Sequence, residues 1–145
     1  MSPAPITAPA RILSAALYAA LAILVDTVDG IPAVYWQQAP GPGPAAALLN
    51  GTLPGAITVQ AQADLLDSGW IGEAAVEAPL LIKAFATSDD AAQDLLAAAV
   101  AAVSTSLPVP PGYALSLRWV GEVPLPPSGG IHTACARYRV TLRRT

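Results

Sequence analysis

Strict alternation of apolar and polar residues along several segments predicts half-buried β-strands. The clearest run covers residues 131–144, and its inward face would carry Ala134, Ala136, Tyr138, Val140 and Leu142. Similar alternation predicts strands over residues 56–64, 74–87 and 113–123, and a shorter strand is expected near residues 33–38. In the strand at 113–123, Trp119 is expected on the core side, whereas Ser116, Arg118 and Glu122 are expected to point outward.

Two Ala-rich segments instead repeat their large apolar residues with the period of an α-helix. In the first, from about Ala10 to Val28, Leu13, Leu17 and Leu21 are four residues apart, and Gly30 with Pro32 is expected to end the helix. The second begins at Ser88, whose hydroxyl can cap a helix, and continues to about Thr105.

These elements predict an α+β fold: a single, mostly antiparallel sheet with two Ala-rich helices packed on one face. Most of the strands that follow one another are joined by connections too short for a crossover, which favours antiparallel pairing. The chain has 145 residues, 31 of them Ala, so we expect one domain spanning residues 1–145 with helices that lie close to the sheet.

Two segments stand apart from this regular pattern. Residues 1–9 form a Pro-rich N-terminal arm, and residues 39–55 are expected to be a long loop that starts with alternating Pro and Gly. The loop carries an apolar patch around Leu48, Leu49 and Leu53. Two interpretations remain open, because the patch would suit a partner contact if it is exposed, or it folds back over the edge of the sheet.

The chain offers few residues for catalysis. It has one His, one Cys and no phosphate-binding or nucleophile motif, and His132 and Cys135 would lie on opposite faces of a strand. We therefore expect no enzyme, no cofactor and no metal site. The longest apolar run, Ile12–Val25, is too short to span a membrane. Pro124–Pro127 fits a PxxP motif, but its place between two strands favours a rigid connection.

The charged residues are sorted along the chain. Residues 1–112 hold nine acidic and two basic residues, whereas residues 113–145 hold five Arg and one Glu. Arg137, Arg139 and Arg143 share one strand face, and Arg118 can join them from a neighbouring strand. These guanidinium groups repel one another unless something acidic lies opposite, and the acidic N-terminal part of a second copy is one candidate. A basic strand face that meets only solvent is the open alternative. A net charge of -3 argues against DNA as the main ligand.

Three segments resemble the tail terminator, or head–tail joining, proteins of long-tailed bacteriophages and gene-transfer particles. They are the strand Val34-Tyr35-Trp36, the helix that starts Ser88-Asp-Asp-Ala-Ala and continues with Leu95–Val100, and the C-terminal strand Ala136–Arg143. The size and the order of elements agree with that family over nearly the whole chain.

The resemblance implies a structural virion protein of the tail or neck, assembled in the host cytoplasm. Family members form a homohexameric ring that caps the tail tube and meets the head connector, with genomic DNA only as cargo in the lumen. The candidate contact residues are then Arg118, Arg137, Arg139, Arg143, Arg144, Leu48, Leu49 and Leu53.

Three alternatives remain open from the sequence. The first is another neck or tail-completion ring, such as a connector or stopper. The second is a small ligand-binding or catalytic domain that uses the face around Trp36, Trp70 and His132. The third is a regulatory module that binds a partner through the loop at 39–55.

Overall fold

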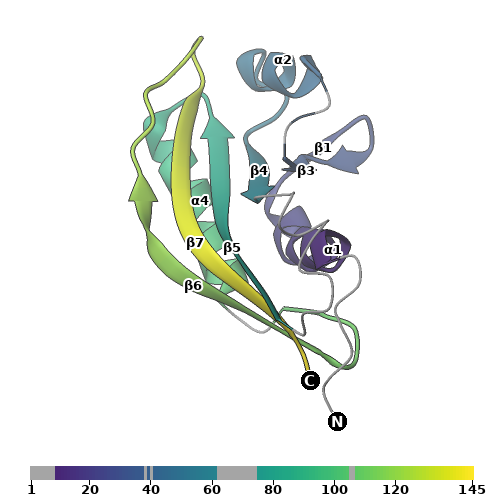
Figure 1. Cartoon of the computed structure of the whole chain (residues 1–145). Coiled ribbons are helices and arrows are strands. Elements are labelled where there is room, and N and C mark those ends of the chain that lie inside the picture. The colour runs from purple at the N-terminus through teal and green to yellow at the C-terminus, as the bar shows by residue number, and fades with distance from the viewer. Residues whose placement is uncertain (1–8, 38, 40, 62–74, 105–106) are drawn as a thin grey trace.

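The computed structural model describes residues 9–37, 39, 41–61, 75–104 and 107–145. Its elements are, in order, α1 (Pro9–Leu21), the 3₁₀ turn η1 (Ala22–Leu24), β1 (Thr27–Val28), β2 (Ile31–Pro32), β3 (Val34–Trp36), α2 (Gly43–Leu49), β4 (Ala56–Ala61), β5 (Ala75–Ala86), α4 (Asp89–Val103), β6 (Tyr113–Val123) and β7 (His132–Arg144). The predicted α+β class is confirmed (Figure 1).

The strands form two sheets, so the prediction of a single sheet is wrong. Five strands lie in the order β3-β4-β5-β7-β6, and β1 with β2 forms a separate two-stranded sheet. Within the larger sheet the pairs β4–β5, β5–β7 and β6–β7 are antiparallel, as expected. β3 and β4 are parallel, because the long connection between them allows the chain to cross over.

Helices α1 and α4 pack against the same face of the five-stranded sheet. Their buried apolar residues join those of β4, β5 and β7 in one core that includes Leu13 and Leu17 of α1, Leu96 of α4, and Leu80 and Ile82 of β5. Ser88 caps α4 as predicted, because its hydroxyl accepts a hydrogen bond from the backbone N–H of Ala91 at 3.2 Å.

The first helix ends earlier than predicted. It stops at Leu21, and the chain then forms the hairpin of β1 and β2, in which Val28 pairs with Ile31. Asp29 and Gly30 make the turn with φ of 54° and 79°. A two-residue hairpin turn needs positive φ at both positions, and Asp-Gly adopts it readily. This dipeptide was therefore a hairpin signal rather than the end of a helix.

The segment at 39–55 contains a helix that the sequence analysis did not predict. Pro42 precedes α2, and Pro44 lies in its first turn, where a missing N–H does no harm. Leu48 and Leu53 are 3% and 2% exposed, in a second core cluster with Ala33 and Ala56. Leu49 is 55% exposed. Two of the three patch residues thus fold back on the sheet and are covered by the chain's own residues, as the second interpretation expected.

A β-bulge near the end of β6 reverses which face of the sheet its last side chains point to. The register with β7 shifts between Trp119 and Gly121, so Glu122 pairs with Ala136, which lies on the core face. The prediction that Glu122 shares the outward face of Arg118 is therefore wrong. A bulge adds one residue to one strand and inverts the alternation beyond it.

Some predictions fall on residues 1–8, 62–74 and 105–106, which lie outside the described residues. They concern the N-terminal arm, the end of the strand at 56–64, the start of the strand at 74–87, the end of the second helix and Trp70.

The different burial of neighbouring leucines in α2 can be tested by truncation. We expect Leu48→Ala to lower the free energy of unfolding by about 2–5 kcal/mol, because it removes buried methyl groups and leaves a cavity. Leu49→Ala, the matched control at an exposed position, should change the free energy of unfolding by less than about 0.5 kcal/mol. Urea unfolding followed by circular dichroism measures both, and equal losses would contradict the burial of Leu48.

Candidate interaction surface

The outer face of the sheet, opposite α1 and α4, carries a row of arginines. Alternation along β7 buries Tyr138 and Val140 on the core side and leaves Arg137, Arg139 and Arg143 exposed on the other side. Arg118 of β6 is exposed and stands directly opposite Arg139 in the β6–β7 register. The predicted grouping of these four side chains, named here the arginine row, is confirmed.

The arginine row has little compensating negative charge. The Nε atom of Arg139 donates a hydrogen bond to Oε1 of Glu77 on β5, and both side chains are about half exposed. Within the described part of the chain, this is the one ion pair between side chains. Lys83 adds a further cation to this face, since it pairs with Cys135 across the β5–β7 ladder. The described residues thus place five cations and one paired carboxylate here, so the described part of this face is cationic.

Three of these arginines surround one open hollow. Arg118, Arg137 and Arg139 line a depression of about 600 Å³ together with apolar side chains, among them Val120 and Leu81. Guanidinium groups that converge in this way can each bind a carboxylate through two hydrogen bonds. The hollow is therefore suited to an acidic surface of another molecule.

Arg144 does not belong to the arginine row, although it was grouped with it as a candidate contact residue. Its Nη1 atom donates a hydrogen bond to the hydroxyl of Tyr113, and its guanidinium lies 4.8 Å from the centre of that ring. Successive residues of a strand face opposite sides, so Arg144 points away from the side of Arg143. It holds the ends of β6 and β7 together.

Near the other edge of the sheet the described residues include Asp26 and Asp29, named here the acidic edge. Both are exposed, and they flank β1 next to the edge strand β3. Burial, and secondarily the Asp29 carboxylate, raises the pKa of Tyr35 in β3, which places Asp29 close to that strand. Asp26 lines a hollow with Asp94 of α4.

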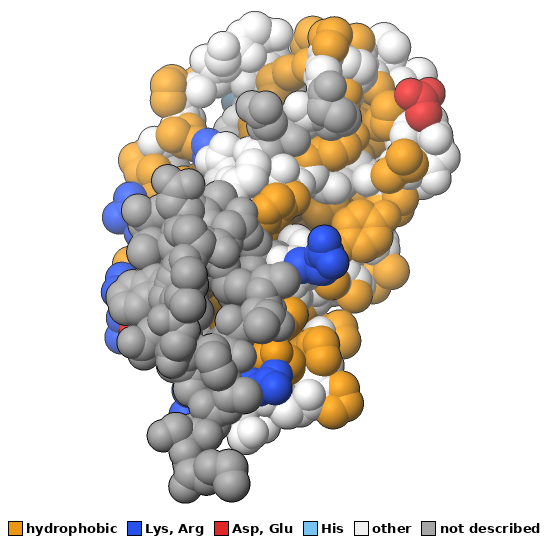
Figure 2. Space-filling view, turned by 45° about the vertical axis from the view of Figure 1, so that its right-hand side comes forward, with side chains coloured by type: hydrophobic (Ala, Val, Ile, Leu, Met, Phe, Trp, Pro, Cys, Tyr) orange, Lys and Arg blue, Asp and Glu red, His pale blue; other side chains and the backbone are white. Residues whose placement is uncertain are grey.

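The arginine row and the acidic edge thus lie at different sides of the sheet. The β1–β2 hairpin and β6 stand at the two sides of the sheet in Figure 1. In the space-filling view, several Lys and Arg side chains lie along the left-hand edge, two more lie nearer the middle, and an acidic side chain lies at the upper right (Figure 2). Hydrophobic side chains cover much of the surface on the acidic side.

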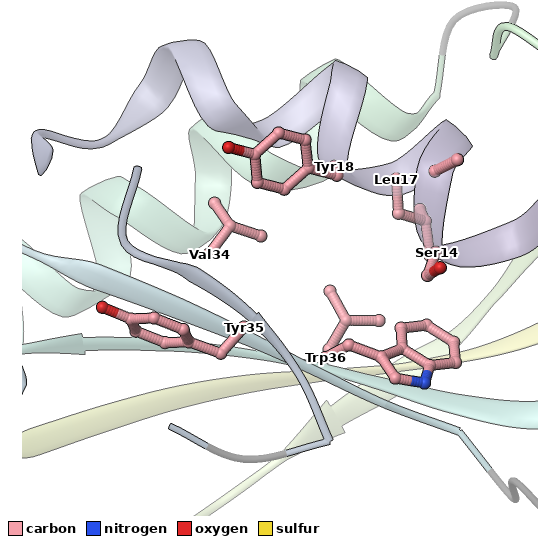
Figure 3. Close-up of a pocket in the computed structure, with 8 residues that line it drawn as sticks. Ser14, Leu17, Tyr18, Val34, Tyr35 and Trp36 are labelled. Atoms are coloured by element: carbon pink, nitrogen blue, oxygen red, sulfur yellow. The ribbon is translucent and has the colours of Figure 1, made fainter. Parts of the chain in front are cut away.

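A second, apolar hollow lies between α1 and β3 (Figure 3). It has a volume of about 310 Å³ and is lined by Ser14, Ala15, Leu17, Tyr18, Val34, Tyr35, Trp36 and Val59. The ligand-binding alternative placed Trp36 and His132 on one face. Trp36 lines this hollow, but His132 does not, because it pairs with Ala86 on the far side of β5.

His132 and Cys135 lie on opposite faces of β7, as predicted. Cys135 pairs with Lys83 and is 2% exposed. Burial raises the pKa of its thiol, although the positive charges of Lys83 and Arg137 act in the opposite direction. The thiol is therefore held protonated, which makes it a poor nucleophile.

Within the described ranges, no three His, Cys, Asp or Glu side chains gather closely enough to hold a metal ion. No helix described there has the length and apolar character needed to cross a membrane. Pro124–Pro127 lies in the connection between β6 and β7, as its position in the sequence indicated.

The raised pKa of Cys135 leads to a labelling prediction. We expect the native thiol to react with Ellman's reagent at least about 100-fold more slowly than the thiol of the urea-unfolded chain, because modification needs local opening. The native rate should stay low from pH 7 to pH 9, because burial raises the pKa of this thiol above its ordinary value of 9.0 and the thiol stays protonated over that range. Equal rates in the native and unfolded protein would contradict the burial.

Comparison with known proteins identifies no relative of this chain. The sequence matches no protein-family model, and no curated protein is significantly similar to it. A function for the chain therefore rests on the arginine row, the acidic edge and the two hollows.

Proposed function

We propose that this protein is a structural virion protein of a long-tailed bacteriophage or related particle. Copies of the chain form a ring, in the family's manner a hexamer, that caps the tail tube and joins it to the head connector. Its partners are a second copy of itself, the tail tube protein and a connector or stopper protein. DNA passes through the lumen as cargo, and the site of action is the tail or neck.

The observation that carries this proposal is the separation of charge across one domain. The arginine row lies on β7 and β6 at one edge of the sheet, and the acidic edge lies beside β3 at the other. Two copies placed head to tail bring these unlike charges together. A head-to-tail contact that repeats with a constant rotation closes into a ring.

The segments that carry the resemblance to tail terminators support the proposal in a second way. They form β3, α4 and β7, which are an edge strand, a helix that covers the sheet and the strand bearing three of the four arginines. The resemblance thus involves the edge strand β3 and the strand β7, which lies next to the other edge.

Hydrodynamics in a salt series tests the proposal. We expect analytical ultracentrifugation at about 0.1 M salt, with or without tail tubes, to show a closed oligomer. The oligomer should dissociate more readily towards 1 M salt, because the Debye length there falls to about 3 Å and attraction between charges is screened. Arg137→Glu should weaken assembly at least about tenfold, since it inverts a charge that lines the cationic hollow. Gln93→Glu adds a negative charge at an exposed position of α4, which packs on β5 and β7 away from the arginine row, and should assemble like the unmodified chain.

Imaging of particles separates the neck positions. A label on this chain should appear as one ring where the tail tube meets the head, whereas a ring inside the head vertex would indicate a connector. A protein that stays monomeric with tail tubes, or whose Arg137→Glu variant loses binding to duplex DNA instead of assembly, would overturn the proposal.

A further inference from the structure

Three apolar side chains are exposed along β6 and just beyond it. Trp119 is 45% exposed and Val120 51%, and Leu125 just beyond the strand is 37% exposed. β6 is 11 residues long, and among the described residues only β7 pairs with it, so its other edge has no strand partner there. A long edge with exposed apolar side chains is a site at which another chain can bind.

The bulge puts two of these side chains on different faces of the sheet. The register shift between Trp119 and Gly121 leaves Val120 without a partner in β7, and Val120 lines the outer hollow with Arg118 and Arg137, whereas Trp119 stays on the core side. Trp119 is held by an edge-to-face contact with Tyr138, with ring centres 5.6 Å apart at 84°. An aromatic side chain held in one orientation loses little freedom on binding, as residues that dominate interfaces do.

The opposite edge of the same sheet presents a complementary cavity. The α1–β3 hollow opens beside the edge strand β3, and Figure 3 shows Tyr18 and Leu17 above it with Val34 and Trp36 below. Its volume of about 310 Å³ lies at the lower end of the ~300–1,000 Å³ found for ligand cavities, enough for one aromatic ring. Tyr18 at its rim is 41% exposed.

We infer that Trp119 of one copy inserts into the α1–β3 hollow of a neighbouring copy. This inference rests on the proposed self-assembly and names the contact that holds the ring. Charge favours a second copy as the occupant: the strand that carries Trp119 also carries Arg118 on its other face, and Asp29 lies close to Tyr35, which lines the hollow. Insertion at one edge therefore brings cations and carboxylates together at the rim.

A symmetric pairing of two β6 strands is less favourable. Such a pairing would join the two sheets into one and bring the Arg118 side chains of both copies close together on the same face. Like charges opposite one another across strands are destabilising. The contact between unlike edges avoids this repulsion. A pair of copies joined in this way still has one unused Trp119 and one unused α1–β3 hollow, so further copies can add until a ring closes.

Two variants each remove one half of the contact. Trp119→Ala removes the side chain that inserts, and Ala15→Phe fills the hollow from an exposed position of α1. We expect each to weaken self-association at least about tenfold by analytical ultracentrifugation, as truncation of a dominant interface residue does. The matched controls are Leu49→Ala, an exposed apolar residue on α2, and Ala101→Phe on the exposed side of α4. Both should associate like the unmodified chain.

Mixing the two variants provides the decisive measurement. The Ala15→Phe chain keeps Trp119 and the Trp119→Ala chain keeps the hollow, so an equimolar mixture should form a one-to-one dimer that cannot grow. Circular dichroism checks that each variant is folded. Rescue by mixing cannot arise from a merely destabilised chain or from a symmetric contact.

The outcomes separate this inference from the proposed function. If the unmodified chain forms rings and both variants still form them, the Trp119 contact is wrong and the ring proposal stands. If both variants are monomers but their mixture gives no dimer, the unlike-edge contact is overturned. If the unmodified chain stays monomeric at millimolar concentration and with tail tubes, both proposals fail.

Discussion

The antiparallel ladder between β5 and β7 is the constraint on which the rest of the domain depends. It runs from the pair Ala75–Arg143 to the pair Ala86–His132 without a register shift. A slip of one residue would exchange the two faces of a strand, so the buried alanines and leucines fix the register. The same register holds Arg137 and Arg139 on the outer face, so the burial of the core and the exposure of the cationic surface have one cause.

Most of the fold could be predicted from the sequence, because the long elements have strict periods. β5, β7 and α4 bury whole faces, and burial imposes alternation or helical spacing on their residues. The misses lie where local chemistry competes with a weak period. Leu24 and Val28 extend the helical spacing of α1, yet Asp29-Gly30 forms a hairpin turn, and the Pro-Gly run at 40–44 obscured the start of α2.

The candidate surface was predictable only in part. The grouping of Arg118 with the β7 arginines follows from alternation and from the adjacency of the two strands. The separate role of Arg144 depends on its ring contact with Tyr113, which spacing cannot show. Likewise, the place of Val120 beside the arginines depends on a bulge, and the α1–β3 hollow depends on how a helix lies on a strand that follows later in the chain.

The alanines that separate α4 from the sheet limit how the sequence can change. Ala78, Ala84 and Ala136 on the strands and Ala92 and Ala99 on α4 have no exposed surface. These sites already carry the smallest side chain with a Cβ atom, so nearly every substitution enlarges them, and overpacking costs about 1–3 kcal/mol each. Sequence variation in this domain is therefore directed to the surface and the edges, where new contacts with other chains arise at little cost to folding.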